Sequence, residues 1–361
     1  MDNTIAVGVI GLGRSGRELH LEPLSKMPPY RVSAVCDQSA ELLARAAKEF
    51  GVRPHAAWEA LLADPEVDLA VVAVPGNLHA PVAIAALEAG KHVVVEKPMA
   101  NTLAEADGML AAARRTGRLL TVFHNRRWDP DYRMLKSLIE RGEFGELLTI
   151  DSRVMSFGRE WPSYGVPEFN PTWRTQAAYG GGFLADWGPH LVDQVLDLVG
   201  DWPVRVVAEL RSCLWSKEVD DYFNVRLAFS SGLLVTLEGS NNARIPLPRW
   251  FVVGSEATLM SGSGFGHWTE MQLSRGREEL TTEVVPCHQE AGNVSQEFDV
   301  ADDLSYLFYR DLAEAFADGR PPAISAARAR DVIALLEAAR RSSELALAVA
   351  PPAAADVYRR K

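Results

Sequence analysis

The first 125 residues alternate short apolar runs with helical patterns, and this alternation limits the possible folds more than any other feature. The apolar runs are residues 4–10, 31–36, 68–74, 91–95 and 119–123. Their near-continuous hydrophobicity is typical of parallel strands that are buried on both faces. Helical patterns lie between them, as at 40–50 and 81–89. Because such units are joined by right-handed crossovers, we expect a doubly wound parallel sheet of an α/β fold.

The pattern changes after residue 125, where strand-like runs follow one another with few helices between them. The longer runs are 147–155, 203–214, 222–229, 232–238 and 249–253. Successive strands with short turns indicate an open, mainly antiparallel sheet. Helical patterns at 131–141, 302–318 and 325–349 accompany it. This part of the chain is therefore expected to form a second α/β unit.

The length of the chain agrees with two units. A single hydrophobic core rarely grows beyond about 250–300 residues, and this chain has 361. We expect one domain over residues 1–125 and another over 126–350. The Ala/Pro-rich tail, 351–361, is expected to fray.

The composition excludes several classes of partner. Charged residues make up 24% of the chain and the net charge is −11 at pH 7, which argues against binding to nucleic acid or to an anionic membrane. No apolar run approaches the roughly 20 residues that span a bilayer, and residues 1–16 lack the pattern of a secretory signal. The three cysteines, Cys36, Cys213 and Cys287, are scattered, so we expect no disulfide framework and a cytoplasmic location.

The end of the first strand carries a glycine motif. Gly11, Gly13 and Gly16 have the spacing Gly-x-Gly-x-x-Gly, with Arg14 and Ser15 inside it. In a loop between a strand and a helix, such glycines permit a tight turn, close approach to a pyrophosphate and close packing. The motif alone is weak, but here it lies in the required strand–helix context. The alternative is an ordinary glycine turn.

Asp37 ends the second strand, 21 residues after Gly16. A carboxylate there can bind the ribose hydroxyls of an adenosine and would repel a 2′-phosphate. No Arg or Lys occupies positions 38–40. These residues predict NAD rather than NADP as the cofactor, and the alternative is a surface aspartate.

Two later strands end in polar residues. Pro75, Asn77 and His79 follow the third strand, and Glu96 and Lys97 follow the fourth. Ligands of open α/β sheets bind beyond the carboxyl ends of the strands. We therefore place these residues at the cofactor site, with Lys97 near the nicotinamide. A solvated Lys97, and a His79 that only packs on the sheet, are the alternatives.

The most informative stretch of the second part begins with three glycines, 180–182. Asp186, His190 and Asp193 follow at helical spacing, so they would share one face. Three interpretations stay open. Asp186 caps a helix with Pro189 in its first turn, the face binds a metal, or the side chains form an acid/base pair. No second ligand cluster accompanies the stretch, so no metal is expected.

Four motifs together resemble the Gfo/Idh/MocA oxidoreductases. They are Gly11-x-Gly13-x-x-Gly16, Glu96-Lys97-Pro98, Trp173-Arg174 and Gly180-Gly181-Gly182-x-x-x-Asp186-x-Gly188-x-His190. The resemblance covers nearly the whole chain. Residues 123–129 and 186–194 resemble the scyllo-inositol dehydrogenase branch in particular. Members of that branch that prefer NADP lack an acidic residue after the second strand, and Asp37 departs from them.

The resemblance implies a Rossmann domain and an α/β domain whose sheet forms a homo-oligomer, a dimer or a tetramer. It implies oxidation of a secondary alcohol of a sugar, cyclitol or glycoside, with NAD as the hydride acceptor. His190 would take the hydroxyl proton, Lys97 would stabilise the alkoxide, and Asp186 would orient one of them. The implied cofactor contacts are Gly11, Gly13, Arg14, Ser15, Gly16, Asp37, Pro75, Asn77, His79, Glu96 and Lys97. The expected substrate contacts are Asn125, Arg127, Trp128, Trp173, Arg174 and Asp193.

Two alternative functions use the same residues. A redox-neutral glycosidase would retain NAD and oxidise its substrate transiently. A sensing protein would bind sugar and NAD without turnover, although Lys97, Asp186 and His190 argue against it. Each part of the chain carries one cluster of chemistry, so we expect the site to lie between the two domains.

Overall fold

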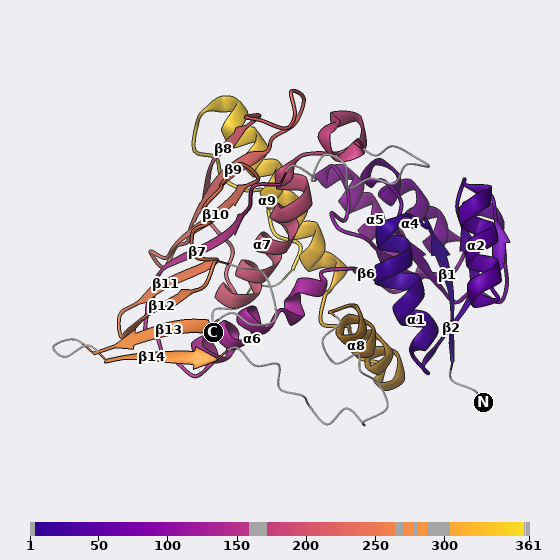
Figure 1. Cartoon of the computed structure of the whole chain (residues 1–361), viewed down its shortest axis with the longest axis horizontal. Helices are drawn as coiled ribbons and strands as arrows, with labels where there is room; N and C mark the ends of the chain where they lie inside the picture. The colour runs from indigo at the N-terminus through magenta and orange to yellow at the C-terminus, as the bar shows by residue number, and fades with distance from the viewer. Residues whose placement is uncertain are drawn as a thin grey trace.

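The computed structural model describes residues 4–158, 172–263, 270–276, 281–286, 304–356 and 358. Figure 1 shows two sheets on opposite sides of the molecule, with helices between them. Cys287 and the start of the helix expected at 302 lie outside the described residues. The two sheets correspond to the two sequence patterns.

The first sheet is parallel throughout and has the strand order β3-β2-β1-β4-β5-β6. Its strands are β1 (Ile5–Ile10), β2 (Tyr30–Cys36), β3 (Arg53–His55), β4 (Leu69–Val72), β5 (His92–Val95) and β6 (Leu120–Val122). All of β4 is buried, as its continuous apolar run predicts. The order reverses between β1 and β4, so the predicted doubly wound Rossmann sheet is confirmed.

Helices cover both faces of this sheet. They are η1 (Ser15–Leu21), α1 (Glu22–Lys26), α2 (Ala40–Phe50), α3 (Trp58–Leu62), η2 (Gly76–Leu78), α4 (His79–Glu88) and α5 (Leu103–Thr116). Their ends follow local sequence signals. Thr102 and Glu105 form a capping box at the start of α5, and Gly117 ends it in the left-handed conformation.

The second sheet is antiparallel except for the parallel pair β7–β10. Its order is β14-β13-β12-β11-β7-β10-β9-β8. The strands are β7 (Leu147–Met155), β8 (Arg205–Arg211), β9 (Tyr222–Ala228), β10 (Leu234–Ser240), β11 (Trp250–Gly254), β12 (Ala257–Ser261), β13 (Glu270–Arg275) and β14 (Thr281–Pro286). Alternate residues along β9 are buried, which is the pattern of a sheet with one covered face.

The remaining helices lie along this sheet or link it to the first domain. They are η3 (Asn125–Trp128), α6 (Pro130–Glu140), η5 (Trp173–Thr175), η6 (Ala177–Tyr179), α7 (Phe183–Val199), α8 (Leu304–Asp318) and α9 (Ala326–Leu345). Helices α7 and α9 contact the second sheet on the side that faces the first domain (Figure 1). Among the described residues, no helix is long and apolar enough to cross a membrane.

Helix α8 follows the second sheet in the chain but packs in the core of the first domain. Phe308, Tyr309 and Leu312 share one buried cluster with Val7 and Val9 of β1. The hydroxyl of Tyr30 also donates to the backbone oxygen of Tyr309 at 2.7 Å. The first domain is therefore completed by a segment from the end of the chain.

The tail that we expected to fray from residue 351 is instead held through residue 356. The buried carboxylate of Asp331 accepts hydrogen bonds from the backbone nitrogens of Ala355, at 2.7 Å, and Asp356, at 3.0 Å. Trp202 donates to the backbone oxygen of Pro352. These partners are distant in sequence, so composition alone could not predict them. Residues 357 and 359–361 lie outside the described part.

Helix α7 is capped from a distant loop. The carboxylate of Asp220 accepts a hydrogen bond from the backbone nitrogen of Leu184 at 2.6 Å, and its backbone oxygen accepts one from Phe183 at 2.8 Å. These bonds satisfy free backbone donors of the first turn. Burial raises the pKa of Asp220 to about 6.

Replacing Asp220 tests this cap. A carboxyl group whose pKa is raised on folding stabilises the fold below its unfolded pKa, and the contribution is lost as pH rises through the folded value. Asp220→Asn keeps an acceptor oxygen but cannot ionise. Between pH 4 and pH 7, we expect wild type to lose up to about 3 kcal/mol of unfolding free energy relative to the variant. Urea unfolding of both proteins across this range measures the difference. Unfolding free energies that change equally with pH in wild type and variant would contradict a raised pKa for Asp220.

Candidate functional site

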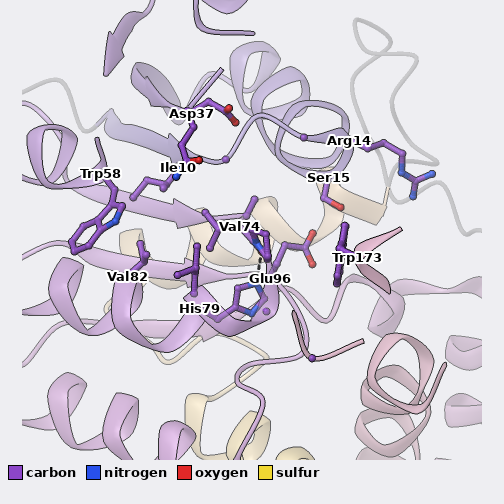
Figure 2. Close-up of a pocket in the computed structure, with 18 of the residues that line it drawn as sticks. Ile10, Arg14, Ser15, Asp37, Trp58, Val74, His79, Val82, Glu96 and Trp173 are labelled. Atoms are coloured by element: carbon purple, nitrogen blue, oxygen red, sulfur yellow. Dashed lines mark hydrogen bonds between the residues drawn. The ribbon is translucent and has the colours of Figure 1, made fainter. Parts of the chain in front are cut away.

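A cavity of about 740 Å³ lies at the carboxyl edge of the parallel sheet, where the expected ligand site should be. Its walls come from the loops after β1, β2, β4 and β5 and from residues 173–186 of the second domain. Figure 2 shows Trp58 and Trp173 on opposite sides of the view, with His79 and Glu96 between them. The cavity is therefore shared by the two domains.

The glycine loop has no room for a side chain at its first and last glycines. Gly11 has φ of +96°, and a Cβ there would lie 2.3 Å from the backbone oxygen of Ala73. A Cβ on Gly16 would lie 1.8 Å from the backbone oxygen of Gly11. Gly13, Arg14 and Ser15 line the cavity beside them. The loop thus brings its backbone close to the cavity beside Ser15 and the cation of Arg14, as a pyrophosphate site requires.

Asp37 faces the cavity with both carboxylate oxygens held. One accepts from the backbone nitrogen of Leu12 and the other from that of Ser39, both at 2.8 Å. The side chain is thereby fixed at the adenosine end, between the glycine loop and the loop after β2. Trp58 lines the same end (Figure 2) and was not anticipated from the sequence. Its only signal is its place after a short strand.

Lys97 and Asp186 meet across the domain boundary. The Nζ atom of Lys97 donates to Oδ1 of Asp186 at 2.7 Å and to its backbone oxygen at 2.8 Å. Both side chains are about a fifth exposed and line the cavity. Nε of Arg174 lies 4.0 Å from Oδ2 of Asp186. One carboxylate therefore joins two positive charges at the carboxyl edge of the sheet.

His190 lies one turn after Asp186 on α7. It is buried, and its Nδ1 has no hydrogen-bond partner among the described residues. Burial, and then the positive charges of Lys97 and Arg126, hold the pKa of His190 well below its usual range. The ring is therefore neutral at pH 7 and able to accept a proton.

The alternatives for this stretch can now be compared. Helix α7 begins at Phe183, so Asp186 is not its cap and Pro189 lies inside it rather than in the first turn. In the described part of the chain, no group of three His, Cys, Asp or Glu side chains could hold a metal. The shared helix face of Asp186, His190 and Asp193 agrees with their spacing.

The expected cofactor residues after β4 and β5 have different surroundings. The ring nitrogens of His79 lie 2.7 Å from the backbone oxygen of Pro98 and 2.9 Å from that of Val74. The ring therefore packs between two loops of the cavity wall. Its burial there lowers the pKa of His79. Pro75 and Glu96 also line the cavity, whereas Asn77 does not.

The expected substrate residues separate into two groups. Trp173 and Arg174 line the cavity, and the guanidinium of Arg174 lies 4.5 Å from the ring centroid of Trp173. The remaining four, Asn125, Arg127, Trp128 and Asp193, are outside its lining.

Arg127 and Trp128 have structural partners instead. Nη2 of Arg127 donates to Oδ1 of Asp193 at 2.8 Å, and its Nη1 lies 2.8 Å from Oδ1 of Asp197. Trp128 packs edge-on against Phe308, with ring centroids 5.8 Å apart. The sequence motif did not reveal this pairing, because the partners are far apart in the chain.

His124 was missed by the sequence analysis. Neither of its buried ring nitrogens has a hydrogen-bond partner within the described residues, and its ring centroid lies 6.1 Å from that of His190. Burial lowers its pKa. It follows β6 at the same edge as Lys97, so the rule that selected Lys97 could also have selected His124.

Two family domains match the chain. Residues 5–124 match the oxidoreductase family with an NAD-binding Rossmann fold, GFO_IDH_MocA. Residues 132–260 match the GFO/IDH/MocA C-terminal domain. The first match covers the parallel sheet and its glycine loop, so this domain is the NAD-binding one.

Similar proteins agree with these matches. The chain is 30% identical over 350 residues to scyllo-inositol 2-dehydrogenase (NADP(+)) IolW of Bacillus subtilis (strain 168), covering 95% of this chain and 94% of that protein. It is 32% identical over 207 residues to levoglucosan dehydrogenase of Pseudarthrobacter phenanthrenivorans, covering 54% and 51%.

A solved structure extends the similarity to the whole fold. The putative oxidoreductase yvaA from Bacillus subtilis superposes with a TM-score of 0.83 at 28% identity, covering 97% of this chain and 99% of that one. Its fold, the two domain matches and the curated relatives point to one conclusion. The chain belongs to the GFO/IDH/MocA family of NAD-binding oxidoreductases.

Proposed function

We propose that this oxidoreductase is an NAD-dependent dehydrogenase that oxidises a secondary alcohol of a cyclitol, sugar or glycoside. The observation that carries the proposal is the contact of Lys97 with Asp186 across the domains, one helical turn from the neutral ring of His190. An alcohol dehydrogenation needs a proton acceptor and a fixed positive charge close together. The names of the inositol and levoglucosan dehydrogenase relatives support the substrate class.

Each residue has a separate role in the proposed reaction. His190 accepts the hydroxyl proton, since its lowered pKa leaves the ring unprotonated at neutral pH. The ammonium group of Lys97 stabilises the developing alkoxide, and Asp186 holds that group in place. Bound NAD supplies the acceptor for the hydride. His124 contributes ring nitrogens without described partners beside His190, which suits a substrate hydroxyl.

The substrate end of the cavity carries an aromatic ring and a cation. Trp173 offers a flat face for the C–H bonds of a sugar ring, and Arg174 offers hydrogen-bond donors. Arg127 and Asp193 satisfy each other in a buried ion pair, so we propose that they support the wall rather than bind substrate directly. Asn125 and Trp128 belong to η3, the same short helix that carries Arg127.

The cofactor preference follows from Asp37. Its carboxylate is held at the adenosine end by hydrogen bonds from two backbone nitrogens. A ribose hydroxyl could donate to it, whereas a 2′-phosphate would be repelled. We propose that NAD is preferred to NADP, although one relative is named for NADP(+).

The proposed reaction is tested by incubating the protein with NAD and a panel of inositols, sugars and glycosides. We expect NADH absorbance with at least one of them, and faster turnover with NAD than with NADP. His190→Ala should lower kcat by about 10²–10⁴-fold, because it removes the proton acceptor. His92→Ala is a control, since His92 lies at the amino end of β5, away from the cavity.

Other results would contradict the proposal. Full turnover by His190→Ala would exclude its role as the base. Release of an aglycone from a chromogenic glycoside, without net NADH, would indicate a redox-neutral glycosidase. Binding of both sugar and NAD without turnover would indicate a sensing protein.

We also propose that the chain forms a homo-oligomer, a dimer or a tetramer, through the second sheet. The face turned away from α7 and α9 carries Val207, Met260 and Val284, which are 41%, 38% and 56% exposed. They lie in one register row across the sheet. Within the row they are separated by Phe251 and by the polar residues Arg226, Thr236, Asp151 and Gln272. A surface that mixes exposed apolar and polar side chains in this way has the composition of many protein–protein interfaces.

The oligomer is tested by sedimentation equilibrium. We expect wild type to be a dimer or larger, and Met260→Glu to dissociate, because it places a charge in the apolar face. Glu256→Gln is the matched surface control and should sediment as wild type does. A monomeric wild type would contradict this proposal.

A further inference from the structure

His20 lies in a buried chain of hydrogen bonds between α8 and the loop that carries Lys97. The residue is fully buried on η1. Its Nδ1 lies 2.6 Å from the hydroxyl of Tyr309, and its Nε2 lies 3.1 Å from Oε1 of Glu96. The ring of Phe123 packs edge-on against the His20 ring, with the ring centroids 4.5 Å apart. None of the sequence motifs contained His20 or Tyr309.

The partners define one arrangement of protons. A carboxylate accepts only, so Nε2 of His20 must donate to Glu96. The hydroxyl of Tyr309 can then donate to the unprotonated Nδ1, which leaves no buried proton without an acceptor. The geometry thus places a proton of His20 on Nε2, facing Glu96, and leaves Nδ1 to accept from Tyr309.

Glu96 continues the chain to Lys97. Its second oxygen, Oε2, accepts a hydrogen bond from the backbone nitrogen of Lys97 at 3.0 Å. Burial by itself would raise the pKa of Glu96, but the hydrogen bond from His20 and the positive charge of Lys97 hold it below its usual range. Without His20, this buried carboxylate would lose one of its two described partners.

The conformation of η1 supports this placement. Residues Ser15–Leu21 form a π-helix that begins inside the glycine motif, at the residue before Gly16. A π turn changes the direction of the side chains that follow it and is frequent at functional sites. Here it lies in the segment that carries His20 to the buried end of Glu96. Figure 2 shows Glu96 beside His79 in the cavity wall.

We propose that His20 is a positioning residue for Lys97. With Tyr309 it fixes the Glu96 carboxylate, and Glu96 fixes the backbone from which Lys97 reaches Asp186. The effect on turnover rests on the proposed dehydrogenase function. Helix α8 would then contribute to the position of Lys97, because its Tyr309 forms the first of the hydrogen bonds that lead through His20 and Glu96 to Lys97.

Kinetics of matched variants test the proposal. His20→Leu removes the donor to Glu96 and should lower kcat by about tenfold to a hundredfold, with KM for NAD unchanged, since small displacements of a reacting group cost this much. His20→Gln keeps a side-chain donor and should recover part of the loss. The control is Tyr30→Phe, which deletes a buried hydroxyl of the same cluster that is not part of the chain.

A second measurement does not depend on turnover. In the full-length protein labelled with ¹⁵N-histidine, we expect His20 to give the Nε2–H tautomer, assigned by its loss in His20→Gln. Tyr309→Phe removes only the donor to Nδ1 and should keep that tautomer, because the Glu96 carboxylate still accepts from Nε2. This variant provides the measurement even if His20→Leu does not fold.

Three results would overturn the proposal: an Nδ1–H tautomer, an unchanged kcat in His20→Leu, or an equal loss in Tyr30→Phe. If wild type turned over no substrate, the dehydrogenase function would fail, while the tautomer would still decide whether the hydrogen-bond chain exists.

Discussion

The contact between Lys97 and Asp186 connects the loop after β5 with helix α7, and both residues line the shared cavity. Neither domain could form this cavity alone, because the glycine loop lines it from one domain and Trp173, Arg174 and Asp186 line it from the other. His190 lies one helical turn from Asp186 and is outside the residues that line the cavity. An ion pair that is about a fifth exposed contributes little to stability by itself. Its importance is geometric, since it places a positive charge next to a neutral histidine at the edge of the sheet where ligands bind.

The last two helices support this geometry. Helix α8 packs in the core of the first domain, and α9 contacts both the second sheet and α7. The backbone nitrogen of Leu103 donates to Glu337 of α9, and Thr121 of β6 donates to the backbone oxygen of Ile324. Since these contacts hold the two sheets on either side of the cavity, the distance from Lys97 to α7 is fixed by the whole chain rather than by one loop.

Much of the fold and part of the site could be predicted from the sequence. Buried strands, the glycine loop and the shared helix face of Asp186 and His190 all have short-range signals, because strand and helix periods are local. The pairing of Arg127 with Asp193 and the contact of His20 with Tyr309 have none, because the partners are 66 and 289 residues apart. The prediction that the tail frays differs from the structure for the same reason. Its composition predicted fraying, whereas Asp331 holds it from the side.

The most direct test of the contact between the domains is a double-mutant cycle. Lys97→Met and Asp186→Asn, alone and together, are compared by kcat/KM for the reduction of NAD. If Asp186 acts by holding Lys97, the double variant loses little more activity than Lys97→Met alone, because each change already breaks the same contact. Losses that multiply in the double variant would show that the two residues act independently, and would contradict a catalytic role for their contact.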